Sequence, residues 1–269
     1  MRPLGRGREI VPGTTILAHL HRSAGLDVYD AWNEPRACRV IVKTPRPDRL
    51  DRPRARARLL REGRLLARLT HPHVVRAYEV HDGARPVIVM ETLSGETLEH
   101  LVARARRGFG ARELANLGAH LASALRHLHA AGVLHLDLKA SNVVAEHGRA
   151  KVIDLSHARR PGRMPAGNGT WCYMAPEQVR GGEIGAAADV WGLGIVLYAA
   201  AALRPNPLAD LADELDVDDP QLHARPVPLR RVRPRLPEEL TTLIDACLEP
   251  DPADRPPLDE ALRRLYALS

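Results

Sequence analysis

A polar segment near the middle of the chain combines residue types that suit phosphate chemistry. It reads His135-Leu136-Asp137-Leu138-Lys139-Ala140-Ser141-Asn142, and Asp154 follows twelve residues later at the end of an apolar run. Carboxylate and amide oxygens bind Mg²⁺ that also holds substrate phosphates, and a lysine can neutralise a phosphoryl group. The segment therefore predicts phosphoryl transfer, with Asn142 and Asp154 as metal ligands, Lys139 as the cation and Asp137 orienting and deprotonating a hydroxyl. Taken singly, the three oxygen-bearing residues are equally compatible with turn or strand-end positions.

A second polar group is expected where a helix packs on a strand. Leu59, Glu62, Leu66 and Leu69 recur at intervals of three and four residues, which places the Glu62 carboxylate on the inward face of a helix. A buried carboxylate requires a cation, and Lys43 on a neighbouring predicted strand is the obvious partner. In the alternative interpretation, Glu62 lies at the solvent edge of the stripe.

The elements that must position these groups fall into two sets, and together they predict an α+β fold. We expect an N-terminal extension over 1–13, a small β-rich lobe with one main helix over 14–93, and a larger α-rich lobe over 94–269. Hydrophobic periodicity and turn residues predict the following segments. The strands are 14–20, 26–32, 38–43, 74–80, 87–91, 143–145 and 151–153, and the helices are 54–69, a leucine-rich stretch ending before Gly132, 186–203, 237–248 and 258–267.

Composition excludes several classes of protein. The chain has 269 residues, 45% hydrophobic and 27% charged, as in a soluble globular protein, and the longest apolar run of 14 residues is too short to span a bilayer. The net charge is +6, but arginines are scattered and aromatic residues make up only 3%, so no nucleic-acid partner is expected. Three separated cysteines predict neither disulfides nor a zinc site, and we expect a cytoplasmic protein.

The polar segment resembles the catalytic loop of eukaryotic-like (Hanks-type) protein kinases. The family patterns HRDxKxxN and DFG correspond to His135-Leu136-Asp137, Lys139, Asn142 and Asp154-Leu155-Ser156. Four further stretches match other parts of the family pattern. Val40-Ile41-Val42-Lys43 matches the phosphate-anchoring strand, and residues 169–177 match the substrate-docking and APE segment. Asp189-Val190-Trp191-Gly192 matches the central helix, and Arg255 matches the arginine that pairs with the APE glutamate.

The resemblance implies a bilobal kinase fold and a bacterial serine/threonine protein kinase that uses ATP with Mg²⁺, or Mn²⁺ in its place, on a protein substrate. It assigns Asp137, Lys139 and Thr170 to catalysis, and Lys43, Glu62, Met90, Glu91, Leu93, Asn142 and Asp154 to the nucleotide and its metal, with Asn142 and Asp154 as the metal ligands. Met90 would be the gatekeeper, with adenine contacting the backbone of Glu91 and Leu93. Simpler interpretations make Thr170 a turn hydroxyl and Met90 a core residue.

The chain departs from the family pattern at three places. The glycine positions of the phosphate-covering loop fall on His21, Ser23 and Leu26, so we expect weaker ATP binding unless Arg22 or His21 supplies a contact. Leu136 replaces the arginine that receives an activation-loop phosphate, and residues 157–169 contain no Ser, Thr or Tyr. Ser156 replaces the DFG glycine, which restricts the flip of that loop.

These departures leave a pseudokinase, kept as a nucleotide-binding or protein-binding scaffold, as the alternative function. Only three of the 39 lysine and arginine residues are lysines, and two of those three, Lys43 and Lys139, occupy the positions where the kinase pattern requires lysine. This usage favours retained nucleotide chemistry. The docking segment and Thr170 disfavour a small-molecule phosphotransferase.

Overall fold

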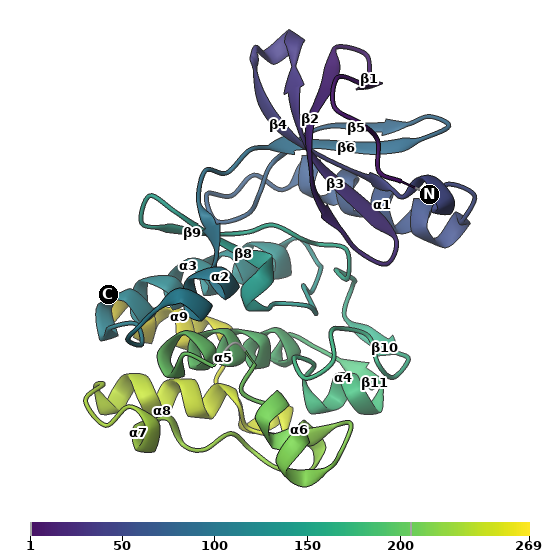
Figure 1. Cartoon of the computed structure of the whole chain (residues 1–269). Helices are drawn as coiled ribbons and strands as arrows, with labels where there is room; N and C mark the ends of the chain where they lie inside the picture. Colours follow the sequence, from purple (N-terminus) through teal and green to yellow (C-terminus); the bar gives the residue numbers. More distant parts are fainter. Residues whose placement is uncertain (1, 205) are drawn as a thin grey trace. The chain divides into compact units, whose positions relative to one another are not determined.

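The computed structural model describes residues 2–204 and 206–269, which divide into two compact units (Figure 1). The N-terminal unit comprises residues 2–94 together with 154–156. The C-terminal unit comprises the described residues of 95–153 and 157–269. The first unit is a curled sheet with one long helix and the second is mainly helical, so the α+β expectation is confirmed.

An antiparallel sheet of six strands, in the order β1-β2-β3-β4-β6-β5, forms the N-terminal unit. Along each strand, successive side chains point to opposite faces. On one face Tyr29, Val42 and Val89 lie side by side in the register and belong to a fully buried apolar cluster. Lys43 is opposite Val28 and Ile88 and therefore points to the other face. The strands are β1 (Glu9–Val11), β2 (Thr14–Arg22), β3 (Leu26–Asn33), β4 (Cys38–Pro45), β5 (Ala77–Asp82) and β6 (Pro86–Glu91).

Helix α1 (Pro53–Arg68) packs on strands β4, β5 and β6, on the face that carries Lys43. The helix begins with a proline, whose fixed φ suits the first helical position. A Cβ on Gly63 would lie 2.9 Å from side-chain carbons of both Ile88 and Val80, so only glycine allows this close approach. The packing buries the predicted stripe and takes the Glu62 side chain out of solvent.

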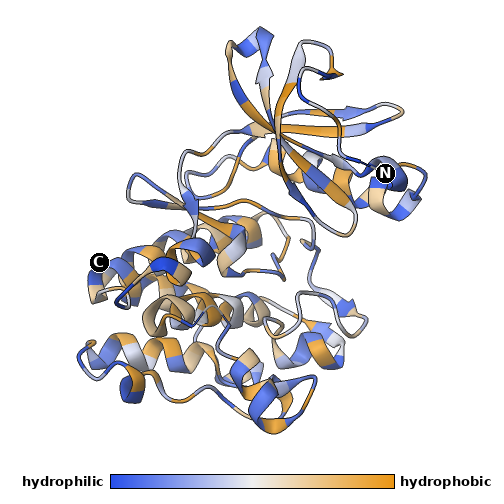
Figure 2. Cartoon of the chain, in the orientation of Figure 1, coloured by the Kyte–Doolittle hydropathy of each residue, from blue (hydrophilic) through white to orange (hydrophobic). Residues whose placement is uncertain are grey.

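The C-terminal unit is built around helix α5 (Ala187–Ala202), which is apolar on almost every side and almost entirely buried, as expected of a helix surrounded by protein (Figure 2). Helix α3 (Ala111–Ala130) packs against α5 and α9. No helix among the described residues is both long enough and apolar enough to cross a membrane. The other helices are α2 (Leu98–Arg104), α4 (Pro176–Arg180), α6 (Ala209–Leu215), α7 (Leu229–Val232), α8 (Glu238–Cys247) and α9 (Leu258–Ala267).

Two small sheets complete the C-terminal unit. Strands β7 (Glu96–Thr97), β8 (Val143–Glu146) and β9 (Arg149–Val152) form one, and β10 (Gly162–Met164) pairs with β11 (Gly182–Ile184) in the other. Short 3₁₀ turns at Glu34–Arg36, Pro47–Arg49, Ala140–Asn142, Pro220–Leu222 and Pro252–Asp254 connect longer elements.

The strand predicted at 74–80 was wrong at its start. Strand β5 begins at Ala77, because Val74 makes only a single β-bridge and Val75 lies in an irregular stretch. Both side chains are buried, and their apolar character reflected burial more than continuous strand pairing. The sheet also includes β1, which lies before the first predicted strand.

Candidate active site

The N-terminal unit brings Lys43, Glu62 and Asp154 into one buried cluster. Lys43 Nζ lies 2.8 and 2.9 Å from the two carboxylate oxygens of Glu62 and 2.8 Å from Asp154 Oδ2. The backbone N–H of Leu155 donates to Glu62 Oε1 at 3.3 Å. Strand β4 supplies the ammonium group, α1 one carboxylate, and the segment 154–156 the other.

Burial and charge act in opposite senses on the pKa values of this cluster. Burial lowers the pKa of Lys43, but the charges of Glu62 and Asp154 outweigh it and the net shift is upward, so Lys43 is a cation. Burial tends to raise the pKa of Asp154, yet the Lys43 charge and hydrogen bonds from Lys43 and Ser156 hold it well below the usual range. Burial raises the pKa of Glu62 to about 7, with Lys43 opposing the rise and Asp154 adding to it. Asp154 is therefore the more firmly ionised carboxylate.

The C-terminal unit brings Asp137, Lys139, Asn142 and Thr170 together. The Thr170 hydroxyl donates to Asp137 Oδ1 at 2.5 Å and accepts from Lys139 Nζ at 2.8 Å. Asn142 Nδ2 donates to the Asp137 carbonyl at 2.9 Å and to Asp137 Oδ2 at 3.2 Å. One oxygen of the Asp137 carboxylate thus accepts from a hydroxyl while the other accepts from an amide. The two contacts fix the orientation of the carboxylate, as a group that takes a proton from a positioned hydroxyl requires.

Buried polar side chains hold the backbone just before Asp137. Leu136 adopts a left-handed conformation with φ of 65°, which is costly for a residue with a Cβ. Asp189 accepts from the N–H groups of His135 and Leu136 at 2.8 and 2.7 Å, and Gln178 donates to the Leu136 carbonyl at 2.9 Å. These contacts offset the strain and fix the direction in which the following aspartate points.

The loop between Ser156 and the APE-like segment is held in place by backbone pairing. Leu134 and Arg159 exchange two hydrogen bonds of 2.7 and 3.1 Å, and β10 pairs with β11 over three residues. Further along, the Gln178 amide donates to the Asn168 carbonyl at 2.7 Å. These hydrogen bonds hold the loop to other parts of the C-terminal unit.

The hairpin at the glycine-rich position continues the sheet to its tip. Arg22 is opposite Asp27 in the register, and Ser23 closes the turn with a 2.9 Å bond to the Leu26 carbonyl. The Arg22 guanidinium donates to both oxygens of the buried Asp27 carboxylate, at 2.7 and 2.9 Å. Arg22, one of the two residues named above as substitutes for the missing glycine contacts, is therefore engaged within the hairpin in this structure.

The predicted adenine-binding segment lies at the end of β6. Met90 is buried and is opposite Ile41 and Ala77 in the sheet. The Glu91 N–H donates to the Arg76 carbonyl at 3.0 Å and is therefore already engaged within the sheet.

The donor chemistry fits a magnesium ion held chiefly by substrate. Asp154, in the N-terminal unit, offers an ionised carboxylate, and Asn142, in the C-terminal unit, donates through its nitrogen, so that its amide oxygen remains as an acceptor. Mg²⁺ commonly takes only one or two protein oxygens alongside water and phosphate. Residues 2–204 and 206–269 contain no cluster of three or more His, Cys, Asp or Glu side chains that could hold a metal.

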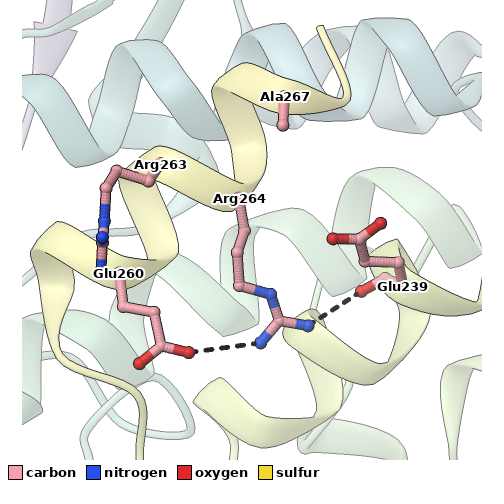
Figure 3. Close-up of a pocket in the computed structure, with 5 residues that line it drawn as sticks. All are labelled: Glu239, Glu260, Arg263, Arg264 and Ala267. Carbon is pink, nitrogen blue, oxygen red and sulfur yellow. Dashed lines mark hydrogen bonds and ion pairs between the residues drawn. The ribbon is translucent and has the colours of Figure 1, made fainter.

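A surface hollow elsewhere in the C-terminal unit contains none of these residues (Figure 3). It lies where α8 and α9 meet. Arg264 bridges Glu260, at 3.7 Å, and the Glu239 carbonyl, at 3.4 Å, so its guanidinium is already engaged by the walls of the hollow.

The sequence analysis did not identify Gln178 or Arg58, which contact the loops that carry Asp137 and Asp154. Gln178 directly follows the APE-like glutamate, but nothing in the pattern distinguished a buried glutamine from a surface one. Arg58 lies one turn before Glu62 on α1 and contacts Ser156, and only its four-residue spacing from Glu62 could have drawn attention to it.

The chain matches the protein kinase domain family over residues 24–267. The serine/threonine-protein kinase PkaA of Streptomyces coelicolor is 33% identical over 277 residues, which cover 99% of this chain and 49% of that protein. The DNA damage-responsive serine/threonine-protein kinase RqkA of Deinococcus radiodurans is 29% identical over 282 residues, covering 99% of this chain and 41% of that protein. The chain thus spans less than half the length of these curated relatives.

A solved structure gives the same result. The crystal structure of the Mycobacterium tuberculosis PknI kinase domain superposes with a TM-score of 0.76 and 25% identity, over 99% of this chain and 100% of that one. The chain therefore belongs to the protein kinase family and is a kinase domain of the bacterial serine/threonine type.

Proposed function

We propose that this chain transfers the γ-phosphoryl group of ATP, with Mg²⁺, to a serine or threonine hydroxyl of a protein substrate. The observation that carries the proposal is the Asp137 carboxylate held between Thr170, Lys139 and Asn142. A carboxylate oriented in this way has the geometry of a general base for a hydroxyl nucleophile.

Each residue has a distinct role in this proposal. Asp137 orients the acceptor hydroxyl and takes its proton, while Lys139, 3.5 Å from Asp137 Oδ2, offers positive charge to the phosphoryl group in transit. Lys43, fixed by Glu62, anchors nucleotide phosphates, and Asn142 and Asp154 hold the metal. Bound ATP with its metal supplies the phosphoryl group and the leaving group. Met90, Glu91 and Leu93 line the adenine position.

The decisive experiment compares phosphate transfer by the wild-type chain and by Asp137→Asn, using ³²P-labelled ATP with the chain itself and a basic protein as acceptors. The exposed residue Asp51 provides the matched control, Asp51→Asn. We expect transfer by wild type and control, loss of at least about a hundredfold in Asp137→Asn, and label on serine or threonine after hydrolysis. Equal transfer by wild type and Asp137→Asn would contradict the proposal. Label on tyrosine would show that the acceptor residue is tyrosine and not serine or threonine.

The pseudokinase alternative rests on the hairpin, which has none of the family's three glycines. Thermal unfolding with and without Mg²⁺ and ATP separates binding from turnover. A ligand at one hundred times its Kd stabilises the folded state by about 2.7 kcal/mol. Stabilisation without transfer would favour the scaffold.

A further inference from the structure

Helix α1 contacts the segment 154–156 through two side chains that lie one turn apart. Glu62 accepts a hydrogen bond from the Leu155 N–H, and Arg58 contacts the next residue. Arg58 Nε donates to the Ser156 carbonyl at 3.0 Å, and its terminal nitrogen donates to the Ser156 hydroxyl at 2.9 Å. All of these residues belong to the N-terminal unit.

Ser156 is the residue at which this chain departs from the family's DFG glycine. Its side chain gives Arg58 a second acceptor that glycine cannot supply, and the residue is only 6% exposed. The planar fork of a guanidinium suits two acceptors on one residue and fixes the direction of approach. The contact therefore restrains both the backbone and the side chain of Ser156.

The restraint on Ser156 reaches the Asp154 carboxylate directly. The Ser156 N–H donates to Asp154 Oδ1 at 2.7 Å, while Asp154 Oδ2 accepts from Lys43 at 2.8 Å. Lys43 in turn contacts Glu62, so the contacts form a closed ring that begins and ends on α1. With both of its oxygens engaged within the ring, the carboxylate has one preferred orientation.

We propose that Arg58 and Ser156 are positioning residues that together hold the Asp154 carboxylate toward Lys43, in place of ordering by phosphorylation. The inference rests on the kinase activity proposed above. Residues 157–169 contain no hydroxyl side chain that could be phosphorylated. A contact between Arg58 and Ser156 restrains the segment permanently, as a contact between an arginine and a phosphorylated loop residue would do only after phosphorylation. The arrangement therefore does not depend on an activating kinase.

Hydrogen exchange on the ligand-free full chain tests the restraint without relying on activity. The probes are the amides of Leu155 and Ser156, both of which are hydrogen-bonded within the ring. Arg58→Ala should accelerate their exchange about tenfold, which corresponds to about 1.4 kcal/mol of local opening. Arg54→Ala, an exposed arginine one turn earlier on the same helix, is the matched control and should leave exchange unchanged. Equal exchange in the two variants would overturn the proposal.

Variants of Ser156 test the shared contact. Ser156→Gly restores the family residue but removes the hydroxyl acceptor, and we expect exchange to rise about threefold because the bond from Arg58 to the carbonyl survives. The double variant Arg58→Ala with Ser156→Gly should exchange no faster than about twice the rate of Arg58→Ala alone, since both changes remove the same contact. Fully multiplicative effects would contradict the shared role.

Steady-state kinetics supply a readout that a merely structural role would not move. We expect Arg58→Ala to lower kcat about five- to tenfold with KM for the acceptor protein within twofold of wild type, and Arg58→Lys to recover only part of the loss because ammonium cannot form the two-pronged contact. Unchanged kcat, or full recovery with lysine, would overturn the proposal. If wild type and Asp137→Asn are both inactive, the proposed function fails, while the exchange experiment still decides whether the restraint exists.

Discussion

Replacing Gln178 by methionine measures how much one buried amide contributes to the geometry of the catalytic loop. The Gln178 side chain is 4% exposed and makes three hydrogen bonds. It accepts from the Ala175 N–H at 3.0 Å and donates to the carbonyls of Leu136 and Asn168 at 2.9 and 2.7 Å. Methionine has a similar length and flexibility but forms none of these bonds with comparable strength.

Gln178→Met loses stability because these three hydrogen bonds are removed and because the buried Leu136 carbonyl is left without its donor. Each of the three bonds contributes about 1 kcal/mol net, and a buried acceptor without a partner adds about 1–3 kcal/mol, so we expect the free energy of unfolding to fall by about 4–6 kcal/mol. For a chain of this size, each 1 kcal/mol lowers Tm by about 2–4 °C. The strained Leu136 loses one of its supports, so kcat should fall as well.

Gln221→Met is a closely matched control in the same unit. Gln221 is 1% exposed, and neither of its amide atoms has a hydrogen-bond partner among the described residues. The same substitution should therefore be neutral or stabilising there. The assays are thermal unfolding and the rate of trypsin cleavage after the exposed residues Arg159 and Arg163, which Gln178→Met should raise at least about tenfold. Equal Tm losses in the two variants would show that glutamine hydrogen bonding is not what holds this loop.

Three further outcomes are expected. Arg255→Lys should lower the free energy of unfolding by about 3 kcal/mol in chemical denaturation, because the buried guanidinium makes a two-pronged contact with a carboxylate and also donates to three backbone carbonyls. Burial raises the pKa values of Cys172 and Cys247 to about 12, so alkylation at pH 8 followed by mass spectrometry should label Cys38 first and the other two only on unfolding. Burial tends to raise the pKa of Asp27, but hydrogen bonds from its neighbours outweigh burial and the net shift is downward. The ionised Asp27 therefore stabilises the folded state fully above the pKa of an unfolded aspartate, about 4, and this stabilisation is lost as the pH falls below that value. Tm should therefore decline less steeply between pH 5 and 2 in Asp27→Asn than in wild type, and parallel curves would contradict this assignment.

The sequence could predict those parts of the site that depend on local spacing. The stripe containing Glu62 needs only the helical period, and Asp137 and Asn142 could be placed near each other because they lie five residues apart in one loop. Both lie within one element or one loop. Their local spacing limits where the side chains can point, whatever the rest of the fold does.

Contacts between distant segments could not be predicted from the sequence. Arg58 and Ser156 are 98 residues apart, and Gln178 and Leu136 are 42 apart, so neither pair leaves a local pattern. The short helix α6 was missed for a different reason. Its single buried residue, Ala212, gives no periodic signal.

The departures from the kinase pattern have different physical consequences, which bears on the choice between enzyme and scaffold. At Ser156 the missing glycine is replaced by a side chain that gains a partner, Arg58, so that position remains ordered. At the hairpin the Arg22 guanidinium is engaged by Asp27 and is not available to a phosphate in this arrangement. We therefore expect the loss to fall on nucleotide affinity rather than on the orientation of Asp137 and of Asp154, each of which is held by contacts within its own unit. A kinase of this kind would show a raised KM for ATP with kcat largely preserved, whereas a scaffold that has lost catalysis would show the reverse, measurable binding with no turnover at any ATP concentration.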